Sequence, residues 1–172
     1  MNKQRRKDIE GGKESGGSAK SLISEQSTIV TEIATDLRGG TTSGIRTRLV
    51  NLKSVIDTAA GKLDDAVSIM ETAKDEEQEY YDNMPENMQN GDKGSNAQTA
   101  IDALSEAESA YQEAQEAAEG ISSQLEEMIG PEDRAEWEQS DADYLDSITD
   151  TIGEIENKVE EAEGHADEAT SA

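Results

Sequence analysis

The chain has 172 residues, of which only 33% are hydrophobic and 3% aromatic, and its formal net charge is −25. Cysteine is absent, so disulfides, thiolate zinc sites and cysteine nucleophiles are excluded. A composition this poor in large apolar side chains is typical either of disorder or of long helices that bury a narrow apolar seam. The spacing of the apolar residues decides between these two.

The charge is divided unevenly along the chain. Residues 1–70 hold eleven Lys/Arg and nine Asp/Glu, a net of +2, whereas residues 71–172 hold four Lys/Arg and 31 Asp/Glu, a net of −27. So dense an acidic surface repels nucleic acid and anionic membranes, and it favours solubility and basic partners. The polar start of the chain does not resemble a secretory signal, and no apolar run approaches the roughly 20 residues that span a bilayer. We therefore expect a soluble protein that is not secreted by a signal peptide and does not bind membranes.

Residues 1–20 are rich in Gly, Ser and Lys and show no apolar period, which predicts a flexible basic arm. The basic side chains cluster at Lys3, Arg5, Arg6 and Lys7. An arm of this kind can contact nucleic acid or an acidic neighbour, and we expect direct nucleic-acid binding only through it.

Two helices are predicted next. Apolar residues spaced three and four apart predict a helix over residues 22–37, which the glycine-rich stretch 38–44 ends. The second helix, over 45–83, carries an unbroken heptad seam made of Ile45, Leu49, Leu52, Ile56, Ala59, Leu63, Ala66, Met70 and Ala73. Continued in phase, the seam meets a charged residue, Glu77, and Pro85 ends the helix.

The acidic half of the chain repeats the same spacing. A helix over 96–129 has its seam at Ala100, Leu104, Ala107, Tyr111, Ala114, Ala118, Ile121, Leu125 and Met128. A last helix over 132–163 has its seam at Leu145, Ile148, Ile152, Ile155, Val159 and Ala162. Beyond Gly164 the seam holds only alanine, so we expect residues 164–172 to form a frayed acidic tail.

These elements predict an all-α fold without strands, with one helical domain over residues 21–163. It is an elongated antiparallel helical hairpin or a three- or four-helix bundle with coiled-coil heptads. Alanine-rich seams bury little apolar area, so a lone hairpin would be marginal. Either the seams cover one another within the chain or they are buried between copies in a homo-oligomer, and the sequence leaves both open.

Signals of enzyme chemistry are nearly absent. The single histidine, His165, has no second histidine with which to build a metal site, and carboxylate pairs at helical spacing are expected from the composition alone. No phosphate-binding loop or calcium-binding loop is complete. We therefore expect a non-enzymatic protein without catalytic, cofactor-binding or metal-ligating residues.

The stretch EEQEYYDNMPENMQNGDKG, residues 76–94, gathers large side chains where the helix over 45–83 must turn back. It is either a helix–turn–helix corner with an apolar lid or a patch that binds a partner, since aromatic and Met side chains are favoured in interfaces. If it is a binding patch, the candidate interaction residues are Glu77, Tyr80, Tyr81, Met84 and Met88.

A segment within residues 74–107 resembles uncharacterised small acidic proteins of tailed bacteriophages and prophages, which share a Tyr-x-Asn-Met-Pro-Glu-Asn core. The matching residues are Tyr81, Asn83, Met84, Pro85, Glu86, Asn87 and Gln89. The resemblance implies a phage-type origin, and hence a location in the host cytoplasm or the virion. It implies no activity.

Together these features predict a protein that acts by interaction or assembly, either virion-associated or accessory to assembly. Its partner is expected to be a protein, either a second copy of the chain or a basic protein. The alternative is an acidic antagonist that mimics DNA and occupies the groove of a host nucleic-acid-binding or defence protein, because spaced Asp/Glu on a helical rod resemble phosphate charges.

Overall fold

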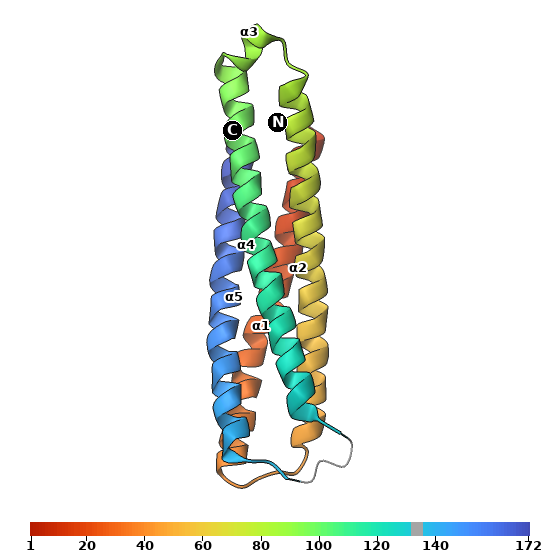
Figure 1. Cartoon of the computed structure of the whole chain (residues 1–172), viewed down its shortest axis with the longest axis vertical. Helices are drawn as coiled ribbons and strands as arrows, with labels where there is room; N and C mark the ends of the chain where they lie inside the picture. The colour runs from red at the N-terminus through yellow and green to blue at the C-terminus, as the bar shows by residue number, and fades with distance from the viewer. Residues whose placement is uncertain (132–135) are drawn as a thin grey trace.

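The structure, a computed structural model, describes residues 1–131 and 136–172. Within these ranges the chain forms no strand and five helices, α1 (Lys3–Arg38), α2 (Ile45–Asp82), α3 (Glu86–Gln89), α4 (Asp92–Ile129) and α5 (Gln139–Ser171). The four long helices alternate in direction and form an elongated bundle, with α3 at one end and the α1–α2 and α4–α5 connections at the other (Figure 1). The predicted all-α fold is confirmed, and the chain forms the four-helix version.

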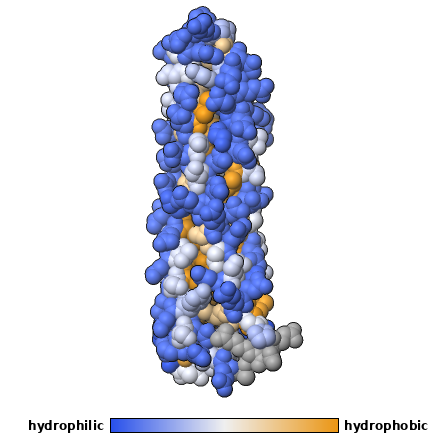
Figure 2. Space-filling view, viewed as in Figure 1, coloured by the Kyte–Doolittle hydropathy of each residue, from blue (hydrophilic) through white to orange (hydrophobic). Residues whose placement is uncertain are grey.

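Each long helix packs against two others: α1 and α4 both contact α2 and α5. The inward faces carry the seams, and every predicted seam residue of α2, α4 and α5 is buried. The face seen in Figure 2 is dominated by hydrophilic side chains, with apolar residues visible only in narrow strips between them. The seams thus cover one another within a single chain, and burying them does not require a second copy.

The expected flexible arm over residues 1–20 is wrong, because residues 3–20 form the first half of α1. Its buried residues continue the heptad spacing backwards through Ala19, Gly16, Gly12, Ile9 and Arg5. A Cβ atom at Gly16 would overlap the ring of Tyr111 on α4. Because Gly12, Gly16 and Arg5 interrupt the apolar residues of this seam, the sequence shows no apolar period here.

Other helix boundaries also differ from the expected ones. Helix α2 ends at Asp82, one residue early, and α4 begins at Asp92, four residues before the predicted start. The predicted start of the last helix at residue 132 lies outside the described residues, and α5 begins at Gln139. The expected frayed tail over 164–172 is also wrong: α5 continues to Ser171 because its alanines extend the seam, and Ala166 and Ala169 are fully buried.

An arginine from α2 holds the end of α4 in place. The guanidinium of Arg46 donates hydrogen bonds to the carbonyl oxygens of Ile129 (2.9 Å), Gly130 (3.1 Å) and Pro131 (2.6 Å). The last carbonyls of a helix lack partners within the helix and carry partial negative charge, so a cation there is favourable. This contact ties the end of α4 to the start of α2.

Candidate functional site

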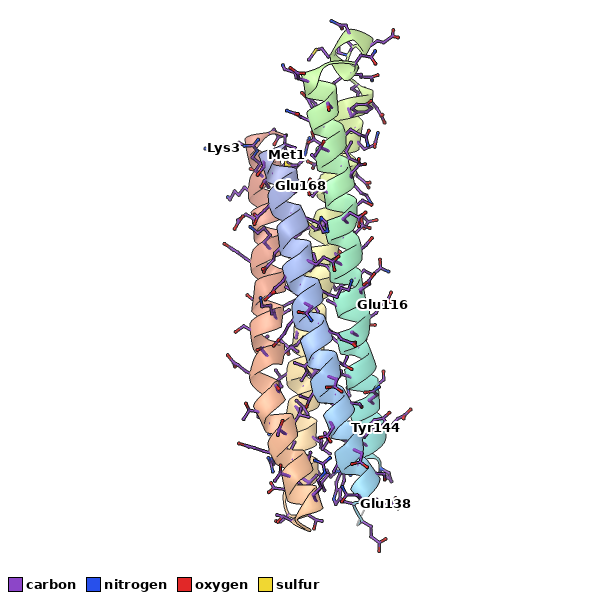
Figure 3. All side chains as sticks on the ribbon, turned by 90° about the vertical axis from the view of Figure 1, so that its left-hand side faces the viewer. Met1, Lys3, Glu116, Glu138, Tyr144 and Glu168 are labelled. Atoms are coloured by element: carbon purple, nitrogen blue, oxygen red, sulfur yellow. The ribbon has the colours of Figure 1, made fainter. Side chains whose placement is uncertain are left out.

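The turn from α2 to α4 extends past the ends of the other two helices. In Figure 3, Met1 and Lys3 at the start of α1 and Glu168 near the end of α5 all lie short of this turn. We call residues 80–94 the hairpin tip; they comprise the end of α2, all of α3 and the first residues of α4. The hairpin tip therefore extends beyond the four-helix part of the bundle, although Tyr80 at its start still lines a small pocket with Met1, Asn2 and Arg5.

Local hydrogen bonds and close packing shape the hairpin tip. The side-chain amides of Asn83 and Gln89 donate to the carbonyl oxygens of Glu79 (2.8 Å) and Tyr81 (3.1 Å), which also accept from the backbone N–H groups of Asn83 and Met84 at the end of α2. Gly94 lies so close to the backbone of Gln89 that a Cβ atom would overlap it. Asn83 and Gln89, two residues of the stretch 74–107, thus stabilise the turn itself.

The five candidate interaction residues divide into two groups. Tyr80 is 43% exposed and lines a small pocket with Met1, Asn2 and Arg5, and Tyr81 and Met88 are half-buried, so each of these three side chains is at least partly accessible. Met84 is only 7% exposed and Glu77 is fully buried, so neither offers a surface to a partner in this structure. Met84 is therefore the most buried of the large apolar side chains of the hairpin tip.

Glu77 is charged at a seam position because it pairs with Arg5. An Arg5 Nη1–H donates to Glu77 Oε2, and Arg5 Nε–H donates to Glu76 Oε2 at 3.1 Å. The α-amino group of Met1 lies 3.9 Å from Glu77 Oε1, an oxygen that accepts no hydrogen bond from the described residues. The pair fills one layer between α1 and α2. In the sequence, the indication that Arg5 faces inward is its position four residues before Ile9, in phase with the buried face of α1.

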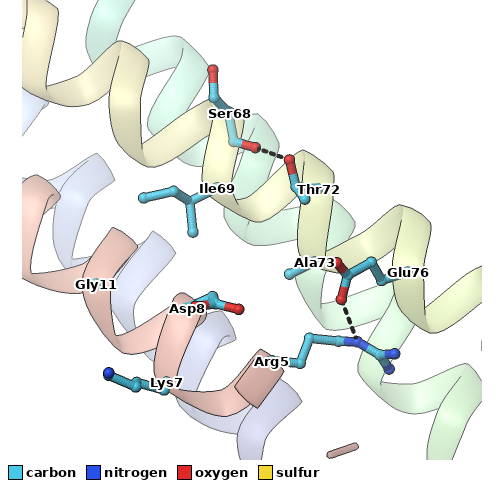
Figure 4. Close-up of a pocket in the computed structure, with 9 residues that line it drawn as sticks. All are labelled: Arg5, Lys7, Asp8, Gly11, Ser68, Ile69, Thr72, Ala73 and Glu76. Atoms are coloured by element: carbon cyan, nitrogen blue, oxygen red, sulfur yellow. Dashed lines mark hydrogen bonds and ion pairs between the residues drawn. The ribbon is translucent and has the colours of Figure 1, made fainter.

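The expected basic cluster is divided by the helix. Lys3, Arg6 and Lys7 are exposed on the first turns of α1, whereas Arg5 is buried. Beside them a groove of about 430 Å³ runs between α1 and α2 (Figure 4). The groove is open because Gly11 has no side chain there, and its apolar lining comes from Ile69 and Ala73.

Ion pairs between helices add charge complementarity to the surface. Lys13 and Lys20 on α1 pair with Asp167 (2.5 Å) and Glu160 (2.8 Å) on α5. The hydrogen bonds to these carboxylates raise the pKa of both lysines, so both ammonium groups keep their charge to a higher pH than a free lysine does. Because acidic side chains outnumber basic ones 40 to 15, the surface stays strongly acidic after such pairing.

The described residues offer little chemistry of other kinds. They contain no group of three or more His, Cys, Asp and Glu side chains arranged to hold a metal ion, and His165 Nδ1 lies 4.0 Å from the nearest Glu168 oxygen. None of their helices combines the length and the apolar character needed to cross a bilayer. No protein-family model, curated protein or solved structure matches the chain.

Proposed function

We propose that this protein is non-enzymatic and binds another macromolecule through the hairpin tip, as a virion-associated or assembly-accessory protein of a phage or prophage. The observation that carries the proposal is the exposure of Tyr80, which is 43% accessible on the last turn of α2, next to the turn that leads to α4. Exposed aromatic and Met side chains are enriched in protein interfaces. The phage context is supported by the resemblance within residues 74–107, and it implies the host cytoplasm or the virion as location.

The hairpin tip suits binding for a second reason. Its backbone is held by the hydrogen bonds from Asn83 and Gln89, so binding would not have to order a loop first. A surface that is already ordered loses less conformational entropy when a partner docks, which raises affinity for a given contact area. The face of the bundle seen in Figure 2, by contrast, presents mainly hydrophilic side chains.

The test is co-purification of the chain with particles of the phage or prophage that encodes it. We expect the wild-type chain to co-purify in a fixed ratio, and Tyr80→Ala combined with Met88→Ala to lower the bound fraction by at least about tenfold, as loss of interface anchors does. The matched control is Tyr144→Ala, a 39% exposed tyrosine on α5 far from the hairpin tip (Figure 3).

Two results would overturn the proposal. Absence of the wild-type chain from particles and from assembly intermediates would refute the assembly role. Equal binding by the tip variant and the Tyr144→Ala control would refute the hairpin tip as the binding surface. Circular dichroism of both variants would show that the helical fold is retained, since the exchanged side chains lie on the surface.

A second candidate, the acidic DNA-mimic antagonist, is supported by the excess of 40 Asp/Glu over 15 Lys/Arg on a rod-shaped bundle. Its signature is capture of a basic nucleic-acid-binding protein from host lysate, with affinity falling steeply as salt rises. The tip variant should not weaken that capture, because the charges lie along the bundle. Capture that is insensitive to salt would exclude this candidate.

A further inference from the structure

We infer that the first half of α1, residues 3–20, is a latch that undocks from the bundle as a unit while residues 21–38 stay in place. We call it the α1 latch. It is a conformational device, and it does not depend on whether the hairpin tip binds a partner. Three independent observations on the first half of α1 support it: its helix propensity, its share of the core and its charge.

The α1 latch is intrinsically a poor helix. It contains Gly11, Gly12, Gly16 and Gly17 within seven residues, whereas residues 21–38 contain no glycine. Glycine is the weakest helix former after proline, because its backbone loses the most conformational entropy on folding. The helical state of the latch therefore depends on its docking against α2, α4 and α5.

That docking buries few apolar side chains. The fully buried apolar residues of the latch are Ile9 and Ala19, whereas residues 21–38 contribute Ile23, Val30, Ile33 and Ala34 to the core. Buried apolar area is the main source of docking free energy, so the second half of α1 is held more tightly than the first. The two halves belong to one continuous helix, yet the second half buries more apolar side chains than the first.

Ion pairs provide part of the docking free energy of the latch, because its apolar contacts are few. The latch carries six Lys/Arg against three Asp/Glu, and it docks on acidic stretches of α2 and α5. Its cations Arg5, Lys13 and Lys20 pair with Glu77, Asp167 and Glu160. Salt screens such pairs where they are exposed, so the closed state should weaken as ionic strength rises.

Opening would uncover buried groups that now face the latch. A Cβ atom on Gly12 would lie 2.7 Å from Met70 Cε, and one on Gly16 would overlap the Tyr111 ring, so these two side chains line the space that the latch fills. Opening would also give water access to Glu77 Oε1, which accepts no hydrogen bond from the described residues when the latch is closed. Solvation of that carboxylate offsets part of the free energy lost on undocking.

Hydrogen exchange on the full-length chain tests the latch directly. We expect amide protection factors for residues 3–20 to be at least about tenfold lower than for 21–38, as for a separate opening unit. Raising NaCl from about 50 mM to about 500 mM should lower protection in 3–20 and leave 21–38 unchanged. Equal protection of the two halves, or no response to salt in 3–20, would overturn the inference.

Two glycine variants make the test independent of any disruption of the fold. A Cβ atom at Gly11 meets nothing within 4 Å, so Gly11→Ala changes helix propensity alone and should raise latch protection about fivefold. Gly120→Ala on α4 adds a Cβ atom that likewise meets nothing, and it should leave residues 3–20 unchanged. Indistinguishable protection of 3–20 in the two variants would show that the latch does not open as a unit.

Discussion

The two ends of the bundle share one heptad spacing but fill it with side chains of different size. Near the α1–α2 and α4–α5 connections, which we call the loop end, the core is mainly large and aliphatic: Val30, Ile33, Ile45, Leu49, Leu52, Ile121, Leu125, Leu145 and Ile148. Near the chain termini and the hairpin tip, which we call the tip end, it is mainly Ala and Gly: Gly12, Gly16, Ala66, Ala73, Ala107, Ala162, Ala166 and Ala169.

The difference shows that a regular seam does not imply uniform stability. Helix–helix contact is continuous along the bundle, but a layer of Leu and Ile removes far more apolar area from water than a layer of Ala and Gly. The tip end makes up part of this deficit with one large ring, Tyr111, and with the Arg5–Glu77 pair. Stability is therefore expected to be concentrated at the loop end.

The largest expected effect is that of a core substitution at the loop end, and it tests whether stability is concentrated there. Leu125 is fully buried at the loop end, and Leu125→Ala should lower the free energy of unfolding by about 3 kcal/mol, through lost transfer energy and the cavity left behind. Ala166→Gly at the tip end should lower it by only about 1 kcal/mol, mainly through helix propensity. Urea unfolding followed by circular dichroism measures both, and equal losses would contradict the comparison.

The next effect concerns the fit between Tyr111 and Gly16. Gly16→Ala places a Cβ atom inside the space of the ring, so overpacking should lower the free energy of unfolding by about 2 kcal/mol although alanine is the better helix former. Adding Tyr111→Leu, which removes the ring, should recover part of that loss. Additive losses in the double variant would show that the two residues do not interact.

A smaller effect is expected where Arg46 caps α4 at the loop end. Arg46→Met keeps the aliphatic stem but removes three hydrogen bonds to carbonyl oxygens, and it should cost about 1 kcal/mol in urea unfolding. Arg6→Met, at an exposed position on α1, is the control and should change the free energy of unfolding by less than about 0.5 kcal/mol. A larger loss for Arg6→Met would reverse the expected ranking.

The smallest expected effect on stability at neutral pH is that of Tyr111→Phe, and this effect grows in alkaline solution. Tyr111 Oη is buried without a hydrogen-bond partner among the described residues, so Tyr111→Phe should be nearly neutral at pH 7. Burial, aided by the nearby carboxylates, raises the pKa of the Tyr111 hydroxyl, so the folded protein keeps this proton where the unfolded chain loses it. The wild type should therefore lose stability relative to Tyr111→Phe as pH rises past about 10, by about 1.4 kcal/mol at pH 11. A constant difference across this range would contradict burial of the hydroxyl.

Much of the fold could be predicted because three of the four seams carry an apolar period. The seams of α2, α4 and α5 predict these three helices and the residues that each of them buries. The first half of α1 could not be predicted, because Gly12 and Gly16 are small only to fit Met70 and Tyr111, and that fit involves residues far away in the sequence. Size complementarity between distant residues leaves no local pattern.

The candidate site was predicted less well than the fold. Residue type singles out Tyr80, Tyr81 and Met88, and none of the three is fully buried. In the sequence, Glu77 and Arg5 each stand out alone. Their pairing can be predicted only if the start of α1 is known to lie beside the end of α2. A charged residue in phase with a seam thus signals a second, oppositely charged one in another seam.

The ring of Tyr111 and the Arg5–Glu77 pair also set the vertical register of α1. Alanine layers look alike, so a helix packed only on alanine could slide by one heptad, roughly 10 Å, with little penalty. Such a slip would bring Ile9 or Ile23 to the level now held by Gly16, where the ring needs an empty position, and would move Arg5 away from Glu77. One ring and one ion pair therefore give a repetitive interface a single alignment.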